Sequence, residues 1–142
     1  MNEETRAVTG GRYCGKVRYT ARRVTAEVTE CHCSQCRKQA GHRYASVGET
    51  AGDGEIDGAD DITWFRSSPV AERGFCATCG STLFWRSLND DEIAILAASI
   101  DDATSLRVTS HIFVDTKGDY YNIDDGLPQL TGYDTPYTPT QI

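Results

Sequence analysis

Three cysteines lie close together in the segment Cys31-His32-Cys33-Ser34-Gln35-Cys36. Side chains two residues apart in an extended segment point to the same face, so Cys31 and Cys33 can reach one point in space. A turn after Ser34 would bring Cys36 back to that point. Three thiolates around one centre suit a soft, tetrahedral ion such as Zn²⁺, and three protein ligands leave one coordination position open. The pattern therefore predicts a zinc site that can bind water or a substrate thiol.

A second set of three cysteines consists of Cys14, Cys76 and Cys79. The run Cys76-x-x-Cys79-Gly80 is typical of a metal knuckle whose glycine relieves a tight turn, although a redox dithiol has the same spacing. A closed structural zinc site needs four ligands. The place for the fourth is position 12, but Arg12 stays protonated and cannot ligate a metal. Either another group completes this site, or it is empty and the thiols pack together.

Length and charge limit the class of protein. A chain of 142 residues suggests one domain, over residues 1–142, with a substantial core. The formal charge of −7 argues against nucleic acid as a partner, because such partners call for a basic surface. The N-terminus has no apolar run, so we expect neither a secretory signal nor a membrane span, and a cytoplasmic location. In the cytoplasm, which is reducing, we expect the six cysteines to be metal ligands or reactive thiols rather than the three disulfides of a secreted protein.

Short alternating or apolar segments between turn signals predict a mainly β domain. We expect strands at residues 16–21, 24–30, 42–47, 62–66, 70–75, 82–86, 92–98 and 111–114. The polar, glycine-containing residues 48–61 predict a loop or hairpin, and the tail after Asp124 should lie on the surface. One short helix is expected at the first cysteine motif, with Ser34 as N-cap and Gly41 at its end. The fold class is therefore a small zinc-binding β-sheet domain with one short helix.

The three histidines are further candidates for the site. His32 lies between two expected ligands, so its side chain should point away from the metal. His42 follows the short helix and is a candidate fourth ligand or acid–base group. His111 lies in an apolar strand and is more simply a core histidine whose hydrogen bonds are satisfied.

Taken together, three motifs resemble the glutathione-dependent formaldehyde-activating enzyme family, which also includes centromere protein V. The motifs are Gly10-Gly11-x-x-Cys14-Gly15-x-Val17-x-Tyr19, Cys31-His32-Cys33-Ser34-x-Cys36-Arg37-Lys38-x-x-Gly41 and Phe75-Cys76-x-x-Cys79-Gly80-Ser81-x-Leu83. The resemblance implies a mainly β zinc fold in which Cys31, Cys33 and Cys36 hold a catalytic zinc. It also implies that Cys14, Cys76 and Cys79 belong to a structural zinc whose fourth ligand is lost at Arg12.

The resemblance implies a carbon–sulfur lyase reaction, in which formaldehyde and glutathione give S-hydroxymethylglutathione. In this hypothesis zinc activates a thiol such as glutathione, and the thiolate adds to a small carbonyl compound. Arg37 and Lys38 would supply positive charge or hold a carboxylate of the thiol; otherwise they form a solvated helix face. A homodimer is compatible with this hypothesis.

Two other hypotheses stay open beside the enzyme. A non-catalytic zinc-binding interaction module would have its site at Cys31 closed by a fourth protein ligand. A thiol redox enzyme that resembles methionine-R-sulfoxide reductases would need two paired Cys-x-x-Cys knuckles and a separate reactive cysteine. This chain offers only Cys33-x-x-Cys36 and Cys76-x-x-Cys79, and its tail has no cysteine.

Overall fold

The computed structural model describes residues 5–50, 54–102 and 105–133. The chain forms two compact units, and each takes two separate stretches of the sequence. Unit 1 draws on Met1–Ala26 and Ser46–Leu106, and unit 2 on Glu27–Ala45 and Arg107–Ile142. Each of the two cysteine sets lies within one unit, the set at Cys31 in unit 2 and the set at Cys76 in unit 1. The expectation of a single domain over residues 1–142 stays a prediction.

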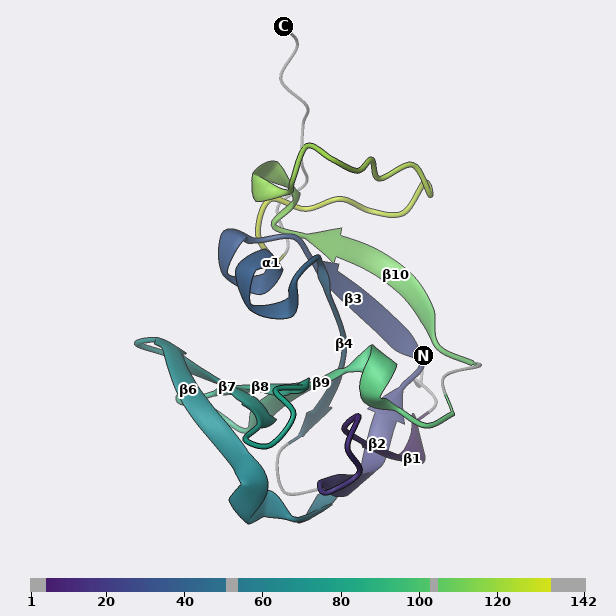
Figure 1. The fold of residues 1–142 in the computed structure, drawn as a ribbon. Helices are drawn as coiled ribbons and strands as arrows, with labels where there is room; N and C mark the ends of the chain where they lie inside the picture. Colours follow the sequence, from purple (N-terminus) through teal and green to yellow (C-terminus); the bar gives the residue numbers. More distant parts are fainter. Residues whose placement is uncertain (1–4, 51–53, 103–104, 134–142) are drawn as a thin grey trace, which may run out of the picture. The chain divides into compact units, whose positions relative to one another are not determined.

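Unit 1 is built from antiparallel strands (Figure 1). Three of them form a sheet in the order β1-β2-β5, with bounds Thr5–Gly11, Arg18–Thr25 and Gly54–Asp57. The others follow the order β4-β9-β8-β7-β6, with bounds Tyr44–Thr50, Glu92–Leu96, Thr82–Ser87, Ala71–Cys76 and Ile62–Ser68. Strand β4 pairs with β9 from Ser46 onward. Short 3₁₀ turns at Ala59–Asp61 and Ala97–Ser99 precede β6 and follow β9.

Alternating side chains of β2 form part of the core of unit 1. Tyr19 and Ala21 are buried, as the two-residue period of a strand requires. Val24 is also buried, three residues after Ala21, because the pairing of β2 with β1 shifts register between these two residues. The Tyr19 ring meets the edge of Phe84 with centroids 5.3 Å apart. Cys76 is fully buried at the end of β7, so the packed strands hold its sulfur in a fixed place.

Unit 2 contains the parallel pair of β3 (Glu27–Cys31) and β10 (Arg107–Ile112) together with helix α1 (Ser34–Ala40). The register sets Ile112 beside Cys31 and His111 beside Glu30. A 3₁₀ turn at Val114–Thr116 follows β10. The later chain returns to this strand, because the His111 N–H donates to Pro128 and the Leu130 N–H donates to His111. The segment that leads into the first cysteine motif therefore lies beside His111.

The predicted fold class is confirmed: the described residues are mainly strand and contain one short helix, at the first cysteine motif. The predicted N-cap at Ser34 is wrong, because Cys33 takes that place. Its backbone is extended, with φ −69° and ψ 162°, and its Sγ accepts the N–H of Cys36. The helix therefore begins inside the cysteine motif. It ends where predicted, at Gly41, whose φ of 85° favours glycine.

Strands β1 and β5 were not predicted. Gly10 and Gly11 lie in β1, although their sequence is typical of a turn. Gly10 packs so closely against Tyr19 and the Ser99 carbonyl that there is no room for a Cβ. Strand β5 is exposed throughout, so it has no hydrophobic alternation to detect, and it joins the sheet through its backbone pairing with β2.

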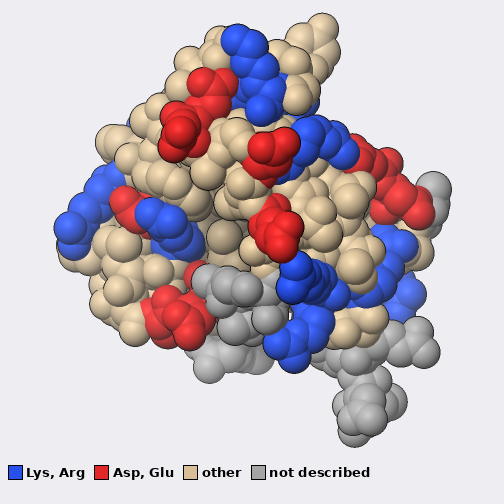
Figure 2. All heavy atoms as spheres, turned by 90° about the horizontal axis from the view of Figure 1, so that it is seen from below, with Lys and Arg blue, Asp and Glu red and all other residues tan. Residues whose placement is uncertain are grey.

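The surface carries charged side chains of both signs (Figure 2). On the face that Figure 2 shows, positive and negative side chains lie interspersed. Residues 125–133, the described part of the tail, are exposed or half-buried, and the tail's remainder, residues 134–142, lies outside the described residues. Within the described ranges, no helix is both long and apolar enough to span a bilayer.

Candidate metal centre

The first cysteine set converges at the junction of β3 and α1. Cys31 ends β3, Cys33 caps the helix, and Cys36 lies buried in the first turn of α1. Their three sulfur atoms all lie within 4.8 Å of one another. The Cys33 Sγ accepts the N–H of Cys36 at 3.3 Å, which fixes the loop between the two thiols. The strand end and the helix start thus place the three sulfurs as the sequence spacing predicts.

The crowding of these thiols has an electrostatic consequence. Hydrogen bonds with the sulfurs of Cys33 and Cys36, followed by burial, raise the pKa of the Cys31 thiol far above its usual range. Three thiolates cannot share so small a space unless a cation balances their charge. A soft divalent ion meets that need, and three convergent sulfurs are a donor set that Zn²⁺ prefers. The residues present therefore fit zinc.

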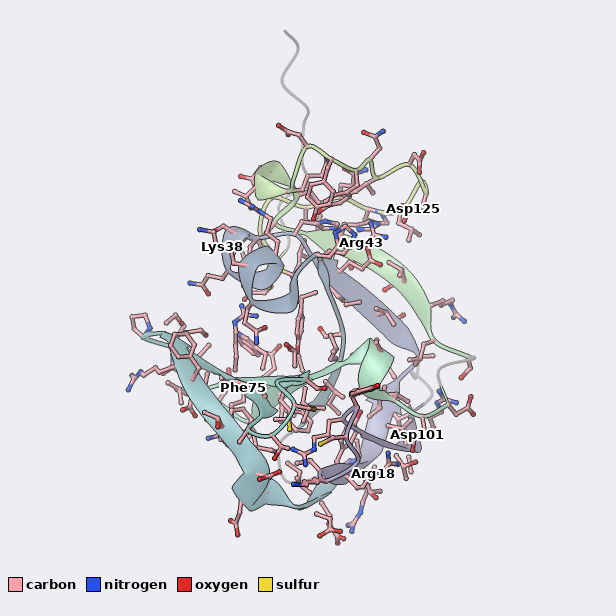
Figure 3. The ribbon with its side chains drawn as sticks, viewed as in Figure 1. Arg18, Lys38, Arg43, Phe75, Asp101 and Asp125 are labelled. Atoms are coloured by element: carbon pink, nitrogen blue, oxygen red, sulfur yellow. The ribbon has the colours of Figure 1, made fainter. Side chains whose placement is uncertain are left out.

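The predicted anion-binding residues lie on α1. Lys38 is exposed on the helix (Figure 3). Arg37 is half-buried, and its Nε donates to the carbonyl of Thr116 at 3.3 Å. That bond uses one of the five donors of a guanidinium, so Arg37 keeps the chemistry for a second anionic partner. Their role toward a substrate stays a prediction.

His32 and His111 form a buried hydrogen-bonded chain in unit 2. The His32 Nδ1 lies 2.5 Å from the hydroxyl of Tyr121, and its Nε2 lies 2.9 Å from the Nδ1 of His111. The His111 Nε2 lies 2.8 Å from the carboxylate of Asp125. Burial, and next the charge of His111, lower the pKa of His32 to about 4, so His32 is neutral at pH 7. The core position predicted for His111 is confirmed.

Four further residues complete this group, and none of them was a predicted site residue: Glu30, Arg43, Tyr121 and Asp125. Glu30 is buried, and its Oε2 lies 2.9 Å from the Nε of Arg43 and 3.4 Å from the Nδ1 of His111. The alternation of β3 could have indicated Glu30, because residues 30 and 32 share the face opposite Cys31. Figure 3 labels Arg43 and Asp125 in this region. Tyr121 and Asp125 come from a later segment without regular structure.

His42, the candidate fourth ligand, makes a hydrogen bond to a tyrosine hydroxyl. Its Nδ1 is 2.8 Å from the hydroxyl of Tyr120, and its ring meets the edge of Tyr121 with centroids 4.8 Å apart. Among the described residues, the ligand atoms that cluster with Cys31 are the sulfurs of Cys33 and Cys36. The structure therefore does not bring His42 into that cluster.

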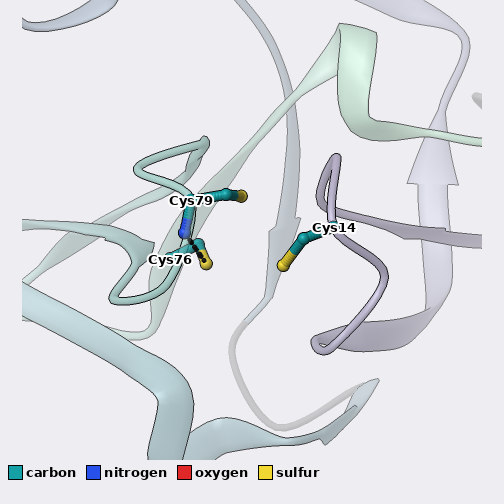
Figure 4. A group of neighbouring side chains, drawn as sticks. All are labelled: Cys14, Cys76 and Cys79. Carbon is teal, nitrogen blue, oxygen red and sulfur yellow. Dashed lines mark hydrogen bonds between the residues drawn. The ribbon is translucent and has the colours of Figure 1, made fainter.

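The second cysteine set also converges, as Figure 4 shows for Cys14, Cys76 and Cys79. The three sulfurs lie within 4.8 Å of one another. The knuckle has the expected form, because the N–H of Cys79 donates to the Cys76 Sγ at 2.9 Å and Gly80 has a φ of 78°. Hydrogen bonds from the hydroxyl and then the backbone of Ser81 lower the pKa of the Cys79 thiol to about 6.

Comparisons with known proteins agree with the geometry. The sequence model of a family described as "Glutathione-dependent formaldehyde-activating enzyme" matches residues 7–116, a range that contains both cysteine sets. The crystal structure of a Rhodobacter sphaeroides protein is similar, with a TM-score of 0.58 and 22% identity. That match covers 71% of this chain and 99% of the other, and it supports the fold alone. No curated protein gives a significant match.

Proposed function

The chain belongs to the glutathione-dependent formaldehyde-activating enzyme family, and we propose that it is a zinc-dependent enzyme that adds a thiol such as glutathione to a small carbonyl compound such as formaldehyde. The observation that carries this proposal is the convergence of the Cys31, Cys33 and Cys36 sulfurs. This cluster has three ligand atoms among the described residues, which suits a catalytic site with one position for a visiting ligand.

The proposed reaction makes one bond between sulfur and carbon. The thiol sulfur adds to the carbonyl carbon, the C=O double bond becomes a single bond, and the proton of the thiol ends on the oxygen as a hydroxyl. When bound at the cysteines, Zn²⁺ supplies a Lewis acid that lowers the pKa of a thiol. The chain's own part is to fix the three sulfurs between β3 and α1 and to orient the thiol substrate.

Substrate orientation falls to the basic residues of α1 in this proposal. Glutathione carries two carboxylates, and Lys38 and Arg37 can each bind one by a charge-assisted hydrogen bond. Lys38 is exposed, whereas Arg37 is half-buried and anchored to Thr116. We therefore assign Lys38 to initial binding of the thiol and Arg37 to holding its orientation.

The test is the rate of S-hydroxymethylglutathione formation, followed by NMR against the uncatalysed reaction. We expect the zinc-loaded protein to accelerate the reaction and Cys33→Ser to remove the acceleration together with the zinc. Lys38→Gln should raise KM about tenfold with little change in kcat, because it removes binding that substrate and transition state share. Lys16→Gln is the matched control, since it removes the same charge from an exposed site in unit 1.

Two outcomes of this measurement would contradict the enzyme proposal. If the zinc-loaded wild-type protein leaves the rate at its uncatalysed value, the enzyme proposal is wrong. Zinc bound at Cys31, Cys33 and Cys36 without any response to thiols would instead favour a non-catalytic zinc-binding interaction module.

A further inference from the structure

Arg12, at the position where the family resemblance places the fourth zinc ligand, contacts the second cysteine set. It follows β1, and its side chain is 0% exposed. Its Nη1 donates to the Sγ of Cys76, and its Nη2 donates to Asp61 at 2.8 Å. One guanidinium therefore contacts both the metal knuckle and the 3₁₀ turn before β6.

Asp61 is tied to the knuckle by a second route. The hydroxyl of Thr78 donates to the same carboxylate oxygen at 2.9 Å, and the N–H of Ala77 donates to the Asp61 carbonyl at 2.7 Å. Arg12 is thus held by a partner that is itself fixed to the knuckle. A side chain so anchored does not swing away to admit an ion.

The Cys76 sulfur has three N–H donors in this arrangement. Besides Arg12, the backbone N–H groups of Thr78 and Cys79 donate to it, at 3.1 and 2.9 Å. Backbone donors of this kind are compatible with a metal-bound thiolate, but the guanidinium already places a positive charge in contact with the sulfur. Arginine does not lose its proton in proteins, so an added divalent ion would face a permanent like charge.

We propose that the Arg12 guanidinium replaces a metal ion at the Cys14, Cys76 and Cys79 group, so that this group holds no zinc. The charge and the cross-link that zinc would supply come instead from Arg12, bridged between Cys76 and Asp61. The second zinc that the family resemblance implies therefore does not fit this chain. Cys14 and Cys79, both exposed, remain as unligated thiols. This inference does not depend on the proposed enzymatic activity.

The first test is zinc content, measured by mass spectrometry on protein prepared with zinc and without chelator. We expect about one zinc per chain, lost in Cys33→Ser and retained in Cys79→Ser. Arg12→Cys supplies the fourth thiolate, so it should raise the content to about two, and the double variant Arg12→Cys/Cys79→Ser should return it to about one. A wild-type zinc that disappears in Cys79→Ser would overturn the proposal, as would a folded Arg12→Cys protein that gains none.

A second measurement needs no variant. Iodoacetamide should alkylate Cys14 and Cys79 in the native, zinc-loaded wild-type protein, because exposed thiols without a metal react, while buried Cys76 should be protected. Peptide mass spectrometry locates the modified residues. Protection of both exposed thiols until a chelator is added would show a bound metal and overturn the proposal even if the Arg12 variants fail to fold.

Discussion

At the scale of single residues, two arginines of unit 1 carry the same charge in different surroundings. The Arg12 side chain is 0% exposed beside Asp61, whereas the Arg18 side chain is 46% exposed beside Asp101 (Figure 3). Arg12 is buried and joins the buried sulfur of Cys76 to the carboxylate of Asp61. Arg18 makes a surface pair, which water and salt screen.

This difference in burial predicts that replacing arginine by lysine destabilises the protein more at position 12 than at position 18. Arg12→Lys keeps the charge but replaces two separate guanidinium nitrogens, one on Cys76 and one on Asp61, by a single ammonium nitrogen, so it should lower the free energy of unfolding by about 2 kcal/mol. Arg18→Lys should lower it by less than about 1 kcal/mol. Urea denaturation of both variants, at a fixed zinc concentration, makes the comparison. Equal losses in the two proteins would show that Arg12 does not have the bridging role assigned to it.

For His111, the burial could be predicted from the sequence but the hydrogen-bond partners could not. The apolar neighbours of His111 correctly predicted a core position, since it is 1% exposed. Its hydrogen bonds to His32 and Asp125 were not predicted, because they join segments 79 and 14 residues away in the chain. The pairing of His111 with His32 follows from the parallel register of β3 and β10, and the pairing with Asp125 follows from the return of the later chain to β10; the sequence pattern contains neither.

At the scale of elements, β1 depends on the absence of a side chain at one position. Gly10 faces the Tyr19 ring and the backbone carbonyl of Ser99, at distances that leave no room for a methyl group. Gly48 in β4 offers a matched contrast, because a Cβ there would meet open space. Neither glycine has a positive φ, so the two positions differ in packing rather than in backbone strain.

We expect Gly10→Ala to lower the free energy of unfolding by about 2–3 kcal/mol, because backbone and ring must move apart to admit the new methyl group. Gly48→Ala should change it by no more than about 0.5 kcal/mol. Thermal unfolding at constant pH and metal content compares the two. A Gly10→Ala protein as stable as the wild type would mean that β1 does not approach Ser99 as closely as described.

Among the strands and the helix, some bounds could be predicted from the sequence and others could not. Most apolar or alternating strands and the end of α1 at Gly41 follow from local chemistry. Strand β9 ends at Leu96, short of the predicted Ala98, because a 3₁₀ turn takes over at Ala97. The helix start was misplaced by one residue because a thiol, rather than the hydroxyl of Ser34, accepts the capping N–H.

At the scale of the whole molecule, each unit contains one cysteine set, and the chain matches its family across both. Spacing alone predicted that Cys31, Cys33 and Cys36 meet, whereas Cys14 was joined to Cys76 and Cys79 as the remaining cysteine and through the family resemblance. The different fates proposed for the two sets depend on Arg12 and Asp61, which come together only in the folded unit. In this account one set is an open metal site, and the other is a cross-link in which an arginine stands where a metal would.

The central claim is that the metal at Cys31, Cys33 and Cys36 can accept a substrate thiol. The direct measurement is the visible absorption of the cobalt-substituted protein during titration with glutathione, since cobalt reports changes in its ligands. S-methylglutathione, which has no free thiol, is the control. The account predicts a saturable spectral change with glutathione alone. An unchanged spectrum at high glutathione, with cobalt still bound, would contradict it.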